Sequence, residues 1–143
     1  MINSYRLIFK NFDFHNSKMS GGSFEMDDAS LSDGGWISWF CSLEGHEFFA
    51  EIPEEYIRDA FNLYGLRRQV AHYSEALQMI LSEETPDEED LQNETFLEVY
   101  QEATDLYGLI HARFIQSTRG LAVMREKFLA GEFGTCPRVF CER

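Results

Sequence analysis

The most regular pattern in the chain is a run of large apolar residues, three and four positions apart, between Phe96 and Arg119. The apolar positions are Phe96, Val99, Tyr100, Ala103, Leu106, Tyr107, Ile110 and Phe114. This spacing places a continuous apolar stripe along one side of a helix that begins near Leu91. The stripe widens after Leu106, which is typical of a central helix with neighbours on more than one side. Gly108 suggests a close packing contact, because glycine inside a helix otherwise costs about 1 kcal/mol relative to alanine.

Two segments before this helix are also expected to be structured. A dense apolar stretch, WISWFCSLEG, predicts a helix over about 36–43, with Asp33 as its N-cap and Gly45 as its C-cap. The next residues, 46–52, lack helical spacing and are expected to be extended.

Proline and glycine mark the limits of the following helix. Pro53 suits the first helical position, and Gly65 is expected to stop the helix. The inward face of this helix is predicted to carry Ile57, Phe61 and Tyr64.

Two further helices flank the central one in the sequence. Residues 70–81 have a helical pattern, with the inward positions Val70, Tyr73, Leu77, Ile80 and Leu81. After the central helix, Thr118 is the predicted cap of a last helix, with the inward positions Leu121, Met124, Phe128 and Leu129. The combined pattern predicts an all-α fold. Residues 1–35 are rich in serine and glycine without a period, and we expect them to be a flexible leader.

The composition narrows the possible partners. The net charge is −13, from 25 acidic and 12 basic residues, which disfavours nucleic acid and anionic membranes and favours basic partners. The sequence contains neither an apolar run of transmembrane length nor a secretory pattern. Three cysteines, an odd number, argue against a disulfide framework, so we expect the cytoplasm and nucleus.

An acidic loop is predicted at residues 82–90. Its acidic residues are Glu83, Glu84, Asp87, Glu88, Glu89 and Asp90. Like charges at this density repel one another, which indicates a solvated loop. Two interpretations stay open: a merely solvated surface, or a negative field that holds polyamines or basic proteins in a salt-sensitive way. Ser30 and Thr85 each precede an acidic residue by three positions, the pattern of acidophilic kinase sites, and are candidate phosphorylation sites.

Two cysteines near the end of the sequence are candidate metal ligands. Cys136 and Cys141 form C-x4-C after glycines, which resembles half of a zinc knuckle or ribbon. A structural zinc ion usually has four ligands. The other candidates do not lie at ligand spacing; they are Cys41, His15, His46, His72 and His111. A zinc half-site that a second chain completes and a pair of free thiols therefore both stay open.

The sequence contains no complete enzymatic motif. The stretch that begins at His46 resembles a zincin motif, but Ala50 stands where the second histidine is required. His72 and Glu75 share a helix face as an expected exposed pair. His111 lies within the apolar stripe and is expected to be a satisfied core histidine. We therefore expect a protein that is not an enzyme.

Several segments together resemble one protein family. They are WISWFC, GHEFFAEIPEEYIRDAFNLYGL, VAHYSEALQMIL, LYGLIHARFI, TRGLAVMREKFLAGEFG and CPRVFC, in this order. These segments are similar to the regulatory (beta) subunit of the protein kinase casein kinase II, and the acidic loop stands in the matching place. The resemblance implies an all-helical domain, residues 36–133, followed by a zinc-binding domain that begins within residues 134–143.

The resemblance also implies a role without catalysis. Such subunits dimerise, hold two catalytic subunits, and modulate activity, stability and substrate choice. It further implies that the acidic loop binds polyamines and basic regulators, and that Cys136 and Cys141 are the first of two zinc-binding cysteine pairs.

The second cysteine pair of the family and its tail have no counterpart in this sequence. The resemblance therefore ends within the zinc-binding domain, on which zinc binding, dimerisation and docking to the catalytic subunit depend in the family. The alternative function is a truncated acidic interaction module that binds basic proteins or polyamines without docking the kinase.

Overall fold

The computed structural model of the protein describes residues 34–134, and the structural statements below concern these residues. They form α-helices and short 3-10 helices and no strand, which confirms the all-α prediction. None of these helices combines the length and apolar character that a membrane crossing requires. In chain order the elements are α2 (Trp36–Ser42), α3 (Glu54–Arg58), η1 (Leu66–Arg68), α4 (Tyr73–Ile80), η2 (Asp90–Gln92), α5 (Glu94–Phe114) and α6 (Thr118–Leu129).

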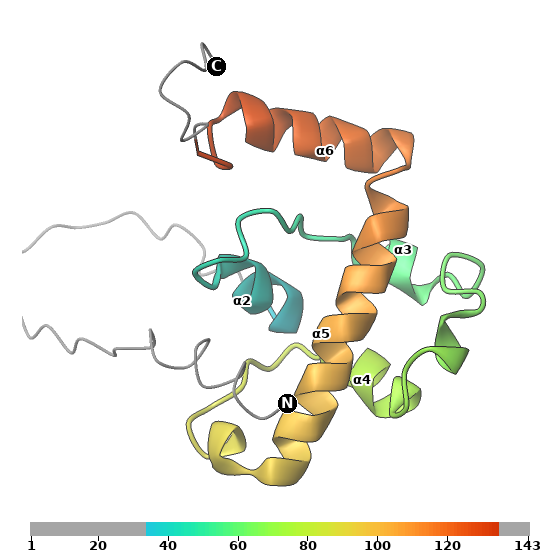
Figure 1. The fold of residues 1–143 in the computed structure, drawn as a ribbon, viewed down its shortest axis with the longest axis vertical. Helices are drawn as coiled ribbons and strands as arrows, with labels where there is room; N and C mark the ends of the chain where they lie inside the picture. Colours follow the sequence, from blue (N-terminus) through green and yellow to red (C-terminus); the bar gives the residue numbers. More distant parts are fainter. Residues whose placement is uncertain (1–33, 135–143) are drawn as a thin grey trace, which may run out of the picture.

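The long helix α5 is central, as predicted (Figure 1). Helix α2 lies on one side of it in this view, α3 and α4 lie on the other, and α6 crosses its C-terminal end. The predicted stripe is confirmed from Tyr100 onward, whereas Phe96 and Val99 are only half-buried. The buried residues of α5 are Tyr100, Ala103, Leu106, Tyr107, Ile110, His111 and Phe114.

Aromatic contacts hold the short helix α2 against α5. The rings of Trp36 and Phe40 stack with their centroids 4.6 Å apart. The ring of Tyr107 meets both edge-on, at 5.9 Å from Trp36 and 5.2 Å from Phe40. A helix of seven residues is not stable alone in water, so this packing accounts for its position.

The central helix begins later than predicted. Leu91 lies in the 3-10 helix η2, and α5 starts after Asn93. The side chain of Asn93 accepts hydrogen bonds from the backbone N–H groups of Thr95 at 3.0 Å and Phe96 at 3.3 Å. This cap satisfies two of the N–H groups that have no partner within the helix.

The turn between α5 and α6 depends on Ser117 and Gly120. Ser117, rather than the predicted Thr118, is the N-cap, because its backbone is extended and its Oγ accepts a hydrogen bond from the Gly120 N–H at 3.1 Å. A Cβ on Gly120 would overlap the carbonyl oxygen of Phe114. A Cβ on Gly108 would meet no atom within 4 Å, so the predicted close contact at Gly108 is wrong.

The predicted caps of α2 are partly corrected. Asp33 lies outside the described residues, and Gly35 directly precedes the helix without a side-chain cap. The helix ends at Ser42 with Leu43 as its C-cap, rather than at Gly45. Gly45 instead has a φ of +88° in the turn that follows, a conformation that glycine adopts without strain.

The helix predicted over 53–65 is too long. Helix α3 ends before Asp59, whose backbone is extended and whose Oδ1 accepts a hydrogen bond from the Phe61 N–H at 2.9 Å. Such a local side-chain bond competes with the helical hydrogen bonds. Ile57 is buried as predicted, but the prediction that Phe61 and Tyr64 point inward is wrong, since they are 86% and 82% exposed.

The helix predicted over 70–81 forms as α4, with Ile80 buried as predicted. Val70 is buried just before the helix begins, and Tyr73, Leu77 and Leu81 are half-buried. Ala76 of the same helix is also fully buried, although it is not among the predicted inward positions.

The predicted inward face of α6 is wrong in three of its four positions. Leu121, Phe128 and Leu129 are 59%, 66% and 65% exposed. Met124 is half-buried against the core. Because α6 crosses the end of α5 instead of lying along it, only part of its surface contacts the other helices (Figure 1).

Candidate functional site

The acidic loop is anchored at its first residue, Ser82. The backbone N–H of Trp36 donates a hydrogen bond to the Ser82 carbonyl oxygen at 3.0 Å. The Ser82 Oγ accepts a hydrogen bond from the Glu84 N–H, also at 3.0 Å. Gly35 lies so close that a Cβ there would overlap the Ser82 carbonyl oxygen. The loop therefore leaves α4 in contact with the start of α2.

The second half of the loop is closed by a reciprocal pair of hydrogen bonds. The Asp87 N–H donates to Asp90 Oδ2 at 3.1 Å, and the Asp90 N–H donates to Asp87 Oδ1 at 2.8 Å. Aspartates commonly stabilise turns in this way. These two carboxylates therefore shape the chain ahead of α5, and part of their hydrogen-bonding capacity is used within the loop.

Four glutamates carry the accessible charge of the loop: Glu83, Glu84, Glu88 and Glu89. All four are exposed, and none forms an ion pair with another residue of the described range. Their common negative field attracts cations over a distance of about 8–10 Å at physiological salt. This arrangement favours basic ligands through long-range attraction rather than through a shaped pocket.

Of the two candidate phosphorylation sites, Thr85 lies within the described residues and Ser30 does not. Thr85 is exposed within the acidic loop, with Glu88 three positions later. Ser30 lies outside the described residues. Both sites stay predictions.

The zinc half-site also stays a prediction, because Cys136 and Cys141 lie outside the described residues. Within 34–134, no group of three or more potential ligands could hold a metal ion. The Sγ of Cys41 lies 3.5 Å from the hydroxyl oxygen of Tyr107. Burial raises the pKa of the Cys41 thiol, which disfavours the thiolate that binds zinc.

Two of the other candidate ligands, the buried His111 and the half-buried His46, form hydrogen bonds within the fold. His111 is only 7% exposed, and its Nε2 accepts a hydrogen bond from the Ala50 N–H at 3.0 Å, which confirms the prediction of a core histidine. Burial, together with a smaller effect of the Lys127 charge, lowers the pKa of His111. The Nδ1 of His46 lies 2.8 Å from the Phe40 carbonyl oxygen. Both imidazoles are therefore engaged within the fold.

The polar role of Tyr107 has no signal in the sequence pattern. Its hydroxyl donates a hydrogen bond to the Ala50 carbonyl oxygen at 2.5 Å and accepts one from the Ile52 N–H at 3.2 Å. Burial raises the pKa of this hydroxyl far above its ordinary value, so the group stays protonated. The prediction that 46–52 is extended is wrong for its first residues, which form a turn in which the Phe49 N–H donates to the His46 carbonyl oxygen at 2.9 Å. The residues after this turn are fixed by side chains of α5, which bond Ala50 and Ile52.

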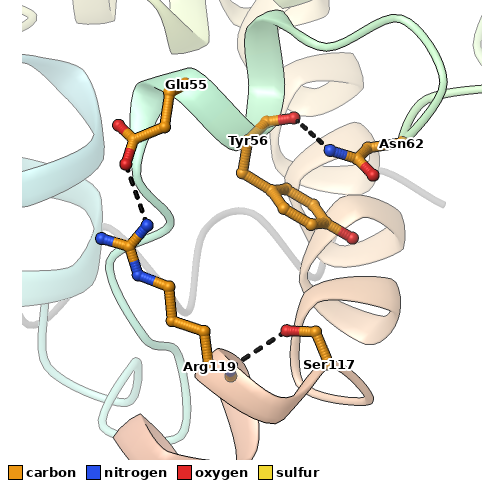
Figure 2. A network of polar contacts seen from close by, with 6 residues as sticks. Glu55, Tyr56, Asn62, Ser117 and Arg119 are labelled. Atoms are coloured by element: carbon orange, nitrogen blue, oxygen red, sulfur yellow. Dashed lines mark hydrogen bonds and ion pairs between the residues drawn. The ribbon is translucent and has the colours of Figure 1, made fainter.

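Polar contacts also join α3 to the start of α6 (Figure 2). Arg119 Nη1 lies 2.9 Å from Glu55 Oε1, and this hydrogen bond lowers the pKa of the Glu55 carboxyl. Asn62 Nδ2 donates to the Tyr56 carbonyl oxygen at 2.9 Å, and the Tyr56 ring meets Phe114 edge-on at 5.2 Å. Because Glu55 and Arg119 are both mostly exposed, their ion pair adds little stability.

Comparison with known proteins gives the family of the chain. Residues 35–143 match the family described as "Casein kinase II regulatory subunit". The chain is 48% identical over 129 residues to "Putative casein kinase II subunit beta-4" of Arabidopsis thaliana, an alignment that covers 90% of this chain and 43% of that protein. It is 49% identical over 121 residues to "Casein kinase II subunit beta" of Dictyostelium discoideum, which covers 84% and 44% of the two chains.

A third relative, "Casein kinase II subunit beta" of Schizosaccharomyces pombe, is 47% identical over 117 residues, which cover 82% of this chain and 48% of that protein. The chain thus spans less than half the length of these curated relatives. The helical elements that position the acidic loop all lie within the residues that match the family. The chain therefore belongs to the casein kinase II regulatory subunit family.

Proposed function

We propose that the chain is a non-catalytic regulatory subunit of the serine/threonine protein kinase casein kinase II. In this role it binds the catalytic subunit and modulates its activity, stability and substrate choice. The match of residues 35–143 to the regulatory-subunit family is the observation that carries this proposal.

The direct test combines purified catalytic subunit with a saturating amount of this chain. Two quantities are measured: the relative phosphorylation rates of several peptide substrates, and the half-life of the kinase activity on heating. We expect a changed order of substrate preference and slower inactivation. Unchanged values of both, with no complex in sedimentation velocity, would contradict the proposal.

The acidic loop supports a second candidate function, the binding of polyamines or basic proteins. The supporting observation is that its four exposed glutamates form no ion pair within residues 34–134. This binding does not require contact with the kinase, so it also describes an acidic interaction module.

Spermine titration tests this function. The loop variant changes four residues to glutamine: Glu83, Glu84, Glu88 and Glu89. The matched control changes four exposed glutamates elsewhere to glutamine: Glu44, Glu75, Glu98 and Glu126. Spermine binding should be lost in the loop variant, persist in the control, and fade above about 0.2 M salt. Equal binding by both variants would rule out a role specific to the loop.

The zinc half-site is the third part of the proposal. Cys136 and Cys141 would supply two thiolates, and the remaining ligands would come from another segment or from a partner chain, as in a homodimer. The spacing of the two cysteines supports this assignment. Freshly purified protein and the Cys41→Ser control should contain zinc, whereas the Cys136→Ser/Cys141→Ser variant should contain none. If none of the three samples contained zinc, the proposed zinc site would be contradicted.

A further inference from the structure

We propose that the segment between α3 and α4 is a docking surface for acidic peptide segments that carry an aromatic or large aliphatic side chain. The surface consists of Phe61, Tyr64, Arg67 and Arg68 and is called the aromatic–basic loop below. It is separate from the acidic loop, and the inference does not depend on the proposed role in kinase regulation.

The first observation is the exposure of two aromatic side chains in one turn. Phe61 and Tyr64 are the most exposed large hydrophobic residues in the described part of the chain. The Tyr64 N–H donates to the Phe61 carbonyl oxygen at 3.3 Å, so both residues belong to one turn of the backbone. Neighbouring exposed aromatic side chains commonly mark an interaction site.

The second observation is the state of the adjacent arginines. Arg67 and Arg68 are both exposed, and neither forms an ion pair with another residue in 34–134. By contrast, Arg58, Arg119 and Lys127 are each paired with a glutamate. In a chain with a net charge of −13, two adjacent arginines without a carboxylate partner are available to carboxylates of another molecule.

The third observation is that the loop is held in one conformation. Leu63 and Leu66 anchor it in the core, where both are buried. The side-chain amide of Asn62 donates a hydrogen bond to the backbone carbonyl oxygen of Tyr56 at 2.9 Å. The backbone carbonyl oxygen of Asn62 accepts a hydrogen bond from Arg113 Nη1 at 2.8 Å. Because these contacts already hold the backbone of the loop, its backbone loses little conformational entropy when a ligand binds.

Charge complementarity selects the ligand. Carboxylates of the ligand can form ion pairs with the guanidinium groups of Arg67 and Arg68. An apolar side chain of the ligand can pack on the rings of Phe61 and Tyr64. A basic segment would be repelled locally by the two adjacent arginines. In Figure 1 the aromatic–basic loop, in green, and the acidic loop, in yellow, lie on opposite sides of α5.

The test is fluorescence anisotropy of the full chain with labelled synthetic peptides. The first peptide consists of aspartate and glutamate with one central phenylalanine. The second has glycine in place of the phenylalanine, and the third has glutamine in place of the acidic residues. At about 0.15 M salt, where charges more than about 8 Å apart are largely screened, only the first peptide should bind well. The other two should bind about tenfold or more weakly.

Charge and aromatic variants locate the binding surface. Arg67→Glu and Arg68→Glu should each weaken binding of the first peptide, and Phe61→Ser/Tyr64→Ser should weaken it about tenfold or more. The matched control is Arg125→Glu, which reverses an exposed arginine of α6 that has no ion pair among the described residues. It should leave the affinity nearly unchanged. Circular dichroism should show the same helicity in every variant, because all substituted residues are exposed.

Three results would overturn the inference. The first is unchanged peptide affinity in the loop variants. The second is an equal loss of affinity in Arg125→Glu, which would show a long-range effect of net charge. The third is self-association of the wild-type chain that Arg67→Glu/Arg68→Glu abolishes, because the ligand of the loop would then be a second copy.

Discussion

At the scale of single residues, Tyr107 joins the core to the loop before α3. Its hydroxyl is the partner of the Ala50 carbonyl oxygen and the Ile52 N–H, and all three groups are buried. Tyr107→Phe leaves the carbonyl oxygen and the N–H group without this partner, so we expect the free energy of unfolding to fall by about 1–3 kcal/mol. Urea denaturation measures the change.

The control for Tyr107 is Tyr64→Phe, which removes the same hydroxyl from an exposed ring. We expect this change to alter stability by less than about 0.5 kcal/mol. If the two variants had the same stability, the hydroxyl of Tyr107 would not hold the loop.

His111 predicts a dependence of stability on pH. Burial lowers the pKa of His111 in the folded protein, so the unfolded chain binds the proton more readily. Stability should therefore decrease as the pH falls below about 6.5, the ordinary histidine pKa, toward the lower pKa of the folded state. The melting temperature of the wild type should show this decrease.

His111→Gln should make the decrease smaller, because glutamine does not titrate and its carbonyl oxygen can still accept the Ala50 N–H. His72→Gln changes an exposed histidine and serves as the control. If His72→Gln reduced the decrease as much as His111→Gln does, the effect could not be assigned to the buried imidazole.

The sequence predicts burial at these positions better than hydrogen bonding. The stripe spacing identifies Tyr107 and His111 as inward residues, because helical period depends only on neighbours three and four positions away. Their polar partners lie 55 to 61 residues away in the chain. No local pattern carries that information, so the contacts could not be predicted from one sequence.

At the scale of elements, two glycines distinguish a close contact from an open position. Gly120→Ala should destabilise the protein by about 1–3 kcal/mol, because the new Cβ would overlap the Phe114 carbonyl oxygen. Gly108→Ala should stabilise it by about 0.5–1 kcal/mol, because the position is helical and open. Thermal unfolding followed by circular dichroism measures both changes. Shifts of equal sign would contradict the assigned contacts.

Helices that are determined by a regular apolar period are predicted well, whereas segments that depend on local side-chain hydrogen bonds or on neighbouring helices are not. The sequence predicts helices α4 and α5 because their apolar period is long and regular. The predicted helix over 53–65 is too long because the Asp59 side chain stabilises a turn that the apolar period does not reveal. The exposed face of α6 has a helical apolar pattern as well, but a pattern does not say whether a neighbour covers it.

At the scale of the whole molecule, two exposed loops carry opposite local charge. The acidic loop displays exposed glutamates, whereas the aromatic–basic loop displays two arginines without ion pairs in the described residues. The position of the acidic loop was predicted from composition alone. The aromatic–basic loop was not, because its aromatic residues fit a helical pattern that the chain does not follow.

Family membership is shown for the matched residues, whereas the regulatory role of the chain is a proposal. The helical domain lies in the matched residues, but the chain spans less than half the length of its relatives. A regulatory role requires contact with the catalytic subunit. An acidic module requires only salt-sensitive attraction of basic partners.

The most direct test captures the endogenous protein from its own cells and quantifies the bound proteins by mass spectrometry. The wash is done at low salt and again at about 0.5 M salt, where exposed charges are strongly screened. If the chain is a regulatory subunit, the casein kinase II catalytic subunit should be captured in a near-constant ratio to the chain at both salt concentrations. Absence of the catalytic subunit, with basic proteins that leave at high salt, would contradict this role and leave the acidic interaction module.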